Sequence, residues 1–405
     1  MDLTSSHIRA VKSLDQIDIA VLVNNIILDA VHDKASDIHI EPWESTLPIR
    51  LRISGTLREL THLPYEFLDR IAGRFKVMAD LVTYETELPQ EGRVPASAES
   101  GNVELRVSIF PTVRGEKIVI RLFDPQNRSF NLETLGFESD TIERFKKLIR
   151  QPSGLILLNG PTGSGKTTAI YSALCHLIDI HGPTISISTV EDPVEFNLPM
   201  ISQSQISNSR GFTYPKALRS LMRQDPEAIM IGEIRDPETA AIAVQAGLTG
   251  HMIFSTIHSD STVGVFARLI NMDIEPFLLA SSITGVLGLR LLRTICPGCK
   301  IQTQPNPEYL SLLPDGFAEE NEFYTGTGCD SCSQTGYLGR VAATELLNSS
   351  EAVREGVIQK LRTSKLHDIA IEQGMTTLWQ NAMAKVQRGI TSLEEVIRVI
   401  SINQL

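Results

Sequence analysis

One stretch constrains this chain more than any other, residues 155–174, which read LILLNGPTGSGKTTAIYSAL. The apolar run at its start predicts a buried parallel strand, and the residues after Lys166 predict a helix. Between them stands the pattern G-x-x-x-x-G-K-[ST], in the strand–loop–helix setting that it requires. Glycines let backbone N–H groups turn toward a phosphate, because a Cβ would block that approach. An ordinary glycine-rich turn would lack these flanks, so the sequence predicts a nucleoside triphosphate site.

The side chains of this loop have separate expected roles. Lys166 is expected to reach the β- and γ-phosphate oxygens, and the Thr167 hydroxyl can ligate magnesium, while the helix N-terminus adds partial positive charge. We therefore expect ATP and magnesium as cofactors. The predicted nucleotide-binding residues of the loop are Gly160, Pro161, Thr162, Gly163, Ser164, Gly165, Lys166, Thr167 and Thr168.

Composition narrows the class of protein. A length of 405 residues indicates two or three domains. With 37 basic and 48 acidic residues the net charge is −11, which disfavours general nucleic-acid binding. No apolar run reaches membrane-spanning length, and the N-terminus lacks the apolar core of a signal peptide. We therefore expect a cytoplasmic protein that contacts a membrane only through partners.

Hydrophobic periodicity predicts the order of the domains. Early in the chain, amphipathic helices over 16–33 and 64–79 accompany period-two strands, which is typical of a small α+β domain. From Thr141 onward helices and apolar strands alternate, as in the α/β class with a parallel sheet. The predicted divisions are the α+β domain 1–126, a linker 127–136, the α/β nucleotide-binding domain 137–292, a cysteine lobe 293–344 and a helical C-terminal segment 345–405, whose last helix begins with a Ser392/Glu395 capping box.

Acidic residues follow two of the predicted strands at their carboxyl ends, where parallel sheets bind ligands. Glu191, Asp192 and Glu195 come after the strand predicted over 184–190. Glu233 follows the strand 228–231, with Gly232 where a magnesium-associated Asp is usual. Clustered carboxylates repel one another unless a cation is near, which suits a magnesium nucleotide. A solvated glutamate is the plainer interpretation of Glu233 alone; the second acidic cluster favours action on metal or water.

Two histidines flank the strand predicted over 252–256. His258 follows this strand on the nucleotide side and is interpreted as a γ-phosphate sensor or proton relay. His251 precedes the strand and is interpreted as structural.

Four of the five cysteines form two C-x-x-C pairs, Cys296/Cys299 and Cys329/Cys332. Redox pairs or disulfides are the alternatives, but a cytosolic chain keeps thiols reduced and a redox motif needs no second copy. The spacing predicts a tetrahedral structural zinc site that folds a small lobe without a part in catalysis. Cys175 stands apart on an apolar helix and is interpreted as core packing.

Three arginines of the first domain, Arg93, Arg106 and Arg121, are candidates to complete the site. Exposed arginines are usually solvated and contribute little. A nucleotide bound between two lobes, however, needs positive charge on its open side, and an arginine finger can come from another domain or subunit.

Together these motifs resemble the secretion and pilus-assembly ATPases of the type II secretion and type IV pilus systems (the GspE/PilB group). The resemblance covers about residues 22–400. It is carried by ASDIHIEP, LPQEGR, GPTGSGKTT, VEDPVEF, LMRQDPEAIMIGEIRDPETA, TGHMIFSTIHSD, the C-x-x-C pairs, TGYLGR and GMTTL followed by TSLEEVIRV.

The resemblance implies a RecA-like ATPase core after a PAS-like N-terminal domain, assembled as a homo-hexamer. It implies an atypical Walker B at Glu233, an acidic box at Glu191, Asp192 and Glu195, and a histidine box at His251 and His258. It also implies that Arg93, Arg106 and Arg121 approach the phosphates as domains rotate. The implied partners are inner-membrane platform and docking proteins, with the ATPase peripheral at the inner membrane.

Three departures from the family pattern stand out. Ser54 replaces the usual Asp of RIDG, and Leu289 replaces the usual Gln of QRL. Members usually carry an earlier domain, whereas this chain begins near their second N-terminal domain.

We expect a motor that hydrolyses ATP to extrude pilin-like subunits, with Glu233 or Glu195 orienting the water. The tetracysteine lobe disfavours a retraction ATPase. The acidic net charge disfavours a DNA translocase or conjugation motor. The complete set of acidic residues disfavours a nucleotide-gated scaffold that binds ATP without useful hydrolysis.

Overall fold

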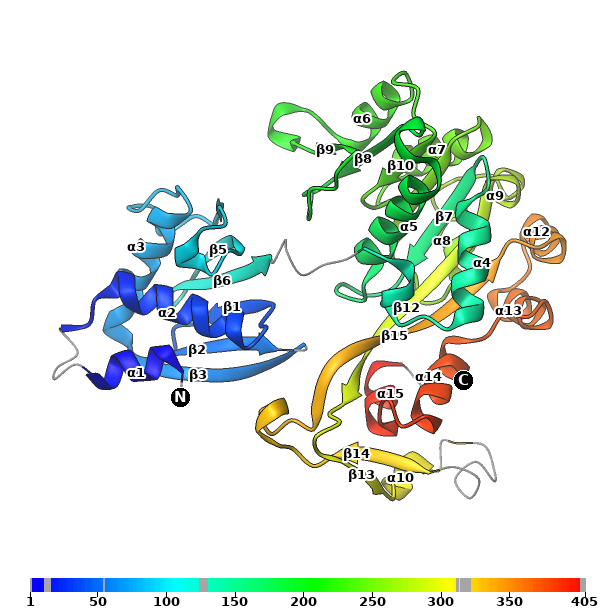
Figure 1. The fold of residues 1–405 in the computed structure, drawn as a ribbon. Helices are drawn as coiled ribbons and strands as arrows, with labels where there is room; N and C mark the ends of the chain where they lie inside the picture. The colour runs from blue at the N-terminus through cyan, green and yellow to red at the C-terminus, as the bar shows by residue number, and fades with distance from the viewer. Residues whose placement is uncertain are drawn as a thin grey trace. The chain divides into compact units, whose positions relative to one another are not determined.

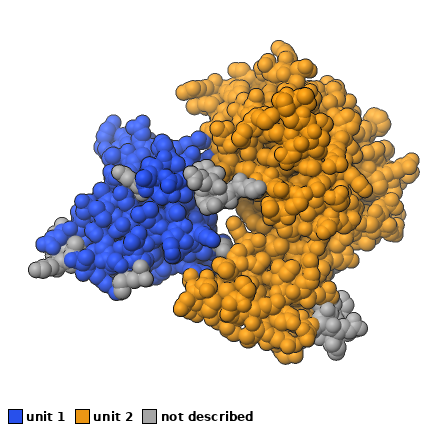
Figure 2. Space-filling view, viewed as in Figure 1, with its two compact units in different colours: residues 1–128 blue, residues 129–405 orange. Residues whose placement is uncertain are grey.

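The computed structural model describes residues 2–10, 16–53, 55–123, 130–310, 313 and 322–400. Ser54, residues 124–126 at the end of the predicted first domain and residues 127–129 of the predicted linker lie outside the described residues. The chain divides into two compact units, residues 1–128 and 129–405 (Figure 2). Within the described ranges no helix combines the length and the apolar character that crossing a bilayer requires.

Unit 1 is built on one antiparallel sheet with strand order β3-β2-β1-β6-β5-β4 (Figure 1). Helices α2 and α3 pack together, and their buried residues, among them Ile26 and Phe75, form one core with strand residues such as Ile38 and Ile120. Alternation along the strands leaves polar side chains on the opposite face. The elements are α1 (Leu3–Ala10), α2 (Ile19–His32), β1 (Asp37–Ile40), β2 (Thr46–Ile53), β3 (Thr56–Pro64), α3 (Leu68–Met78), β4 (Gln90–Val94), β5 (Glu104–Thr112) and β6 (Gly115–Phe123).

Unit 2 is built on a seven-stranded sheet with order β15-β12-β7-β11-β10-β8-β9. All its neighbouring strands are parallel except the β12–β15 pair. The strands predicted over 155–158, 228–231 and 252–256 are confirmed as β7, β10 and β11. The strands are β7 (Gly154–Asn159), β8 (Ile187–Glu191), β9 (Ser202–Gln205), β10 (Ala228–Ile231), β11 (Met252–Ile257), β12 (Ile283–Ile295) and β15 (Tyr337–Asn348), with the separate hairpin β13 (Lys300–Thr303) and β14 (Phe323–Gly326).

Helices flank the seven-stranded sheet. Residues of α7, α8, α9, α12 and α13 share one buried core with alternate residues of β7, β10 and β11. Helix α5 packs against β7 and β11 as well. The helices are α4 (Ser139–Ile149), α5 (Lys166–His181), α6 (Tyr214–Leu221), α7 (Pro237–Leu248), α8 (Gly264–Ile270), α9 (Pro276–Ser282), α10 (Pro307–Leu310), α12 (Glu351–Ile358), α13 (Thr363–Glu372), α14 (Leu378–Gln387) and α15 (Leu393–Val399).

The long pair β12–β15 corrects two predicted boundaries. Both strands run without a break from the sheet toward the cysteine lobe (Figure 1), so boundaries at 292 and 344 fall inside strands. Glu345, predicted to begin the helical segment, lies in β15 opposite Gly288, and the tail helices begin at Glu351. The two strands are the longest of the sheet. Their pairing is long-range, so local periodicity did not reveal it.

The C-terminal helices are held to β12 by a buried carboxylate. Ser392 caps α15, as predicted, because its side chain accepts a hydrogen bond from the Glu395 N–H. Glu395 makes no reciprocal bond to the cap, so the predicted capping box is half right. Its fully buried carboxylate instead accepts hydrogen bonds from Arg293 Nη2 at 2.8 Å and Arg398 Nη2 at 2.7 Å. Hydrogen bonds from these guanidinium groups lower the pKa of Glu395 although burial opposes this.

Replacing Glu395 with Gln should destabilise this region by about 3 kcal/mol, because a buried ion pair loses one partner. Trp379 of α14 lies in one apolar cluster with Val396 of α15, the residue next to Glu395. Its fluorescence, measured in a Trp43→Phe background, therefore reports the urea-induced unfolding of this region. The control is Glu394→Gln, at a half-buried neighbouring position, which should change the midpoint little.

The difference between wild type and Glu395→Gln should shrink as the pH falls below the ordinary glutamate range. A lowered folded-state pKa contributes stability above the unfolded pKa and loses it as pH falls through the folded value. Equal midpoints at pH 7 would contradict the assigned role.

Candidate functional site

The loop after β7 has the geometry of a phosphate cradle. A Cβ on Gly160 would lie 2.5 Å from Leu289 O and 2.6 Å from Ser164 Oγ, so only glycine fits there. Gly165 caps α5 in the left-handed region with φ of 95°. The Ser164 hydroxyl is buried and has no hydrogen-bond partner among the described residues. An orphaned hydroxyl and a helix N-terminus in one tight loop fit a phosphate group.

Lys166 is the centre of charge in this loop. Its ammonium group donates hydrogen bonds to Gly160 O at 2.7 Å and Pro161 O at 2.9 Å. Burial lowers the pKa of Lys166, and Arg290 adds to the lowering, while the carboxylates of Glu233 and Glu195 oppose it. The structure therefore brings two of the predicted catalytic acids within electrostatic reach of the predicted phosphate-binding lysine.

Side-chain bonds tie together the strand ends that carry these acids. Ser255 Oγ donates to Ile231 O at 2.9 Å, and Thr256 Oγ1 donates to Gly232 O at 2.8 Å. The Gly232 N–H donates to Val190 O at 2.8 Å. The carboxyl ends of β8, β10 and β11 thus form one edge, with Glu191 and Glu233 at neighbouring positions.

Glu191 is far more enclosed than its neighbours in the acidic cluster. Its carboxylate is 2% exposed and accepts hydrogen bonds from the hydroxyls of Tyr171 and Thr189 and from Gln203 Nε2 at 3.1 Å. Three protein donors on one carboxylate make it an organising group of the site. Asp192 and Glu195, by contrast, are exposed to solvent.

Sequence reasoning missed two tyrosines that organise the acids. Burial and the Glu191 carboxylate raise the pKa of Tyr171. Burial raises the pKa of Tyr214 too, with Asp192 and Glu233 as the next causes. The Tyr214 hydroxyl lies 2.6 Å from where a Cβ on Gly232 would stand, so an Asp at position 232 would displace it. No local pattern marks these tyrosines, because each reaches the acids from a separate helix.

The two histidines lie at opposite ends of β11. His258 is exposed directly after the strand, on the edge of the phosphate loop. His251 precedes the strand. Its backbone carbonyl oxygen accepts a hydrogen bond at 3.0 Å from the N–H of Gly154, the first residue of β7. Six residues at about 3.3 Å each separate the two ends by roughly 20 Å. His251 therefore lies at the end of β11 away from the phosphate loop, and its structural role stays a prediction.

The predicted arginines of unit 1 form one cross-strand row. Arg93 pairs with Arg106 between β4 and β5, and Arg106 pairs with Arg121 between β5 and β6. Directly opposed residues share a face, and opposed like charges destabilise a sheet. Asp37 is next in the row and accepts from Arg121 Nε at 2.9 Å. The row continues with Arg52, which also pairs with Asp37, while Arg106 lies 3.8 Å from Glu104 of its own strand.

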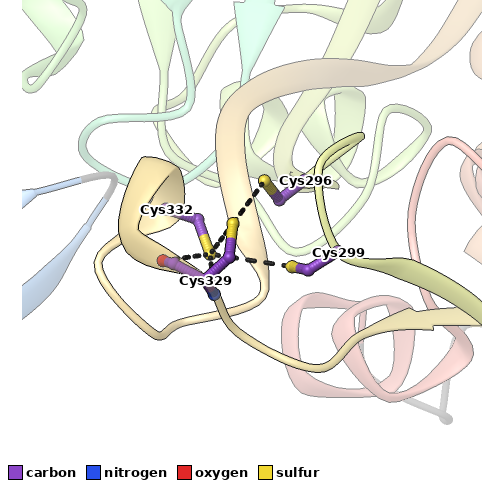
Figure 3. Close-up of side chains that lie close together, drawn as sticks. All are labelled: Cys296, Cys299, Cys329 and Cys332. Atoms are coloured by element: carbon purple, nitrogen blue, oxygen red, sulfur yellow. Dashed lines mark hydrogen bonds between the residues drawn. The ribbon is translucent and has the colours of Figure 1, made fainter.

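The four cysteines of the two C-x-x-C pairs converge at the end of the β12–β15 hairpin (Figure 3). Sγ–Sγ distances are 3.8 Å for Cys296–Cys329, Cys299–Cys332 and Cys329–Cys332. None of these four described cysteines forms a disulfide. Four thiolates around a tetrahedral ion at about 2.3 Å lie about 3.8 Å apart. The cluster therefore fits a metal ion.

Comparison with known proteins matches these features over nearly the whole chain. The family model described as "Type II/IV secretion system protein" matches residues 12–398. The type IV pilus assembly ATPase PilB of Myxococcus xanthus is 42% identical over 391 residues, covering 95% of this chain and 68% of PilB. The type II secretion system ATPase E of Vibrio cholerae is 41% identical over 388 residues, covering 96% of this chain and 76% of that protein.

A solved structure has the same fold at low sequence identity. The X-ray structure of the Legionella pneumophila ATPase DotB superposes with a TM-score of 0.68 at 20% identity, covering 95% of this chain and 96% of DotB. This likeness supports the RecA-like α/β fold expected from the sequence, with its mainly parallel sheet.

Protein purified without chelator should contain one divalent metal ion per chain, because four thiolates at these distances form a complete ligand set. Elemental analysis should find the metal lost in Cys332→Ser and kept in Cys175→Ser, whose cysteine lies on α5 away from the cluster. Full metal content in Cys332→Ser would contradict the site.

Proposed function

This chain is an ATPase of the type II/IV secretion system protein family, and we propose that it drives the assembly or extrusion of pilin-like subunits. The observation that carries the proposal is the common edge formed by the carboxyl ends of β8, β10 and β11, which sets Glu233 beside the acidic segment after β8, with Glu233 and Glu195 in electrostatic reach of Lys166. Binding alone needs only the cradle, whereas hydrolysis needs an acidic group that orients water. The relatives named above are assembly and secretion ATPases, which favours extrusion over retraction.

In the proposed mechanism the loop amides and Lys166 hold the β- and γ-phosphates. Lys166 must first leave the carbonyl oxygens of Gly160 and Pro161, to which it is bonded. The Thr167 hydroxyl, with Asp192 or Glu195, would hold magnesium, which neutralises phosphate charge. Glu233 or Glu195 orients the attacking water. His258 senses the γ-phosphate, and Glu191 sets the position of the acidic segment through Tyr171.

We propose that the arginine row of unit 1 neutralises charge on the phosphates. A row of adjacent guanidinium groups on one face is stabilised by an anion. Arg106 is half-buried with its guanidinium 4.2 Å from the centre of the Phe123 ring, which restricts its motion. Such arginines act on charge that develops in the transition state.

The remaining parts of the proposal concern the assembly. The cysteine cluster is proposed to hold structural zinc, because tetrathiolate sites with this spacing favour zinc. The active form is proposed to be a homo-hexamer at the cytoplasmic face of an inner membrane, docked on platform proteins of the apparatus. Direct binding of nucleic acid is not expected, and stimulation of phosphate release by DNA would instead indicate a translocase.

Lys166→Ala should abolish binding of a non-hydrolysable ATP analogue, because the cradle loses its cation. Glu233→Gln should bind the analogue normally but release phosphate about 100-fold more slowly, because the water loses its orienting carboxylate. Glu238→Gln, at an exposed carboxylate on α7, is the control and should keep the wild-type rate. Wild-type turnover in Glu233→Gln would reassign the catalytic role to Glu195.

Arg106→Ala should lower kcat at least about tenfold while analogue affinity changes little, since arginine fingers act mainly on the transition state. The matched control is Arg114→Ala, at the exposed β5–β6 turn of the same sheet. Steady-state kinetics and analogue titration on the oligomer separate the two effects. A loss of affinity without a change in kcat would place the row away from the reacting phosphate.

A further inference from the structure

Two side-chain hydrogen bonds connect the segment that carries His258 to strands β7 and β15. His258 begins the loop 258–263, which connects β11 to α8. At its start the Ser259 N–H donates to Asn159 Oδ1 at 3.2 Å. Near its end the Thr262 hydroxyl donates to Glu345. Asn159 is the residue immediately before the phosphate loop, so the first bond joins the two loops directly.

Packing supports the end of this loop, where Thr262 and Val263 are buried. Val263 at its end is buried in the core. Toward α13, however, a cavity of about 340 Å³ separates loop residues from the helix. The residues that line this cavity include Asp260, Ser261 and Thr262 from the loop and Thr363, Ser364 and His367 from α13. The loop borders this cavity, so the hydrogen bonds at Ser259 and Thr262 contribute to its position on that side.

The surroundings of Glu345 favour its hydrogen bond with Thr262. Its side chain sits in β15 at 7% exposure, opposite Gly288 of β12. A Cβ on Gly288 would lie 2.8 Å from Thr262 Cγ2, so glycine there makes room for Thr262 to reach the carboxylate. The second carboxylate oxygen accepts a hydrogen bond from the Leu378 N–H at 3.0 Å. Leu378 is the first residue of α14, where backbone donors favour negative charge.

We propose that Glu345 is a positioning residue for ATP hydrolysis, which holds His258 at the phosphate edge through Thr262 and makes that position depend on the docking of α14. The proposal rests on the role of His258 proposed above. One carboxylate bridges the loop and the C-terminal helix. A displacement of α14 therefore reaches the hydrolysis edge through two hydrogen bonds, without any change in the phosphate cradle.

The test compares kcat with nucleotide affinity in the full-length oligomer. Thr262→Val removes only the hydroxyl donor, and Glu345→Gln removes the charge and one acceptor. Both should lower kcat at least tenfold, while the Kd for a non-hydrolysable ATP analogue stays within twofold. Thr262→Ser keeps the hydroxyl and should retain the wild-type rate, a rescue that a purely steric role of Thr262 would not give. Glu372→Gln, at an exposed position on α13, is the matched control.

A double variant tests the route through His258. His258→Ala should be slow by itself, and adding Glu345→Gln should slow it no further. An additive loss overturns the route, and wild-type kcat in Thr262→Val overturns the positioning role even if Glu345→Gln fails to fold. A wild-type oligomer that binds ATP without hydrolysing it overturns the proposed function itself. If the wild type hydrolyses ATP and the Thr262→Val and Glu345→Gln variants hydrolyse it at the same rate, only this inference is overturned.

Discussion

The parallel pairing of β7 with β11 and β12 is the constraint on which unit 2 depends. It places Asn159 beside Ile257 on one side and Gly288 on the other. The phosphate loop therefore leaves the sheet between the histidine loop and the Leu289–Arg290 segment. Gly160 has to be a glycine because the Leu289 carbonyl oxygen lies where its Cβ would stand. A single strand register thus decides which groups surround the phosphate loop.

Charge is distributed unequally between the two units. The edge of the unit 2 sheet collects carboxylates around one lysine, whereas the open face of unit 1 aligns arginines around Asp37. Opposed like charges weaken a sheet unless an anion or a carboxylate offsets them. Each unit thus gathers charge mainly of one sign, and each group of charges is proposed above to act on the phosphates or on magnesium. Coulombic complementarity is accordingly the physical basis of the proposed mechanism.

Strand β12 joins three parts of unit 2. It borders the phosphate loop at Gly288 and Leu289, it anchors α15 through Arg293 and Glu395, and it leads to the cysteines. Strand β15 lies beside it over most of its length and contributes Glu345 to the histidine loop. The cysteine lobe, helix α15 and the sheet edge that carries the phosphate loop are therefore all connected to one pair of strands.

The sequence by itself determined the parts whose chemistry is local. The loop from Gly160 to Thr168 and the C-x-x-C pairs are short patterns, since phosphate and metal binding require fixed spacing along the chain. The burial of β7 and β10 followed from apolar runs. The clustering of acids at one sheet edge was also foreseeable, because parallel strands bring their carboxyl ends together.

Only the tertiary structure decided which side chains from distant segments complete the site. Tyr171, Tyr214 and Glu345 reach their partners from two helices and a strand, and none stands in a pattern of its own. The incomplete capping box at Ser392 is likewise a result of tertiary structure. Arg293, about a hundred residues earlier in the chain, donates hydrogen bonds to the Glu395 carboxylate that would otherwise complete the box. Contacts between residues so far apart in the sequence depend on how strands pair and helices pack. Local secondary-structure propensity predicts neither.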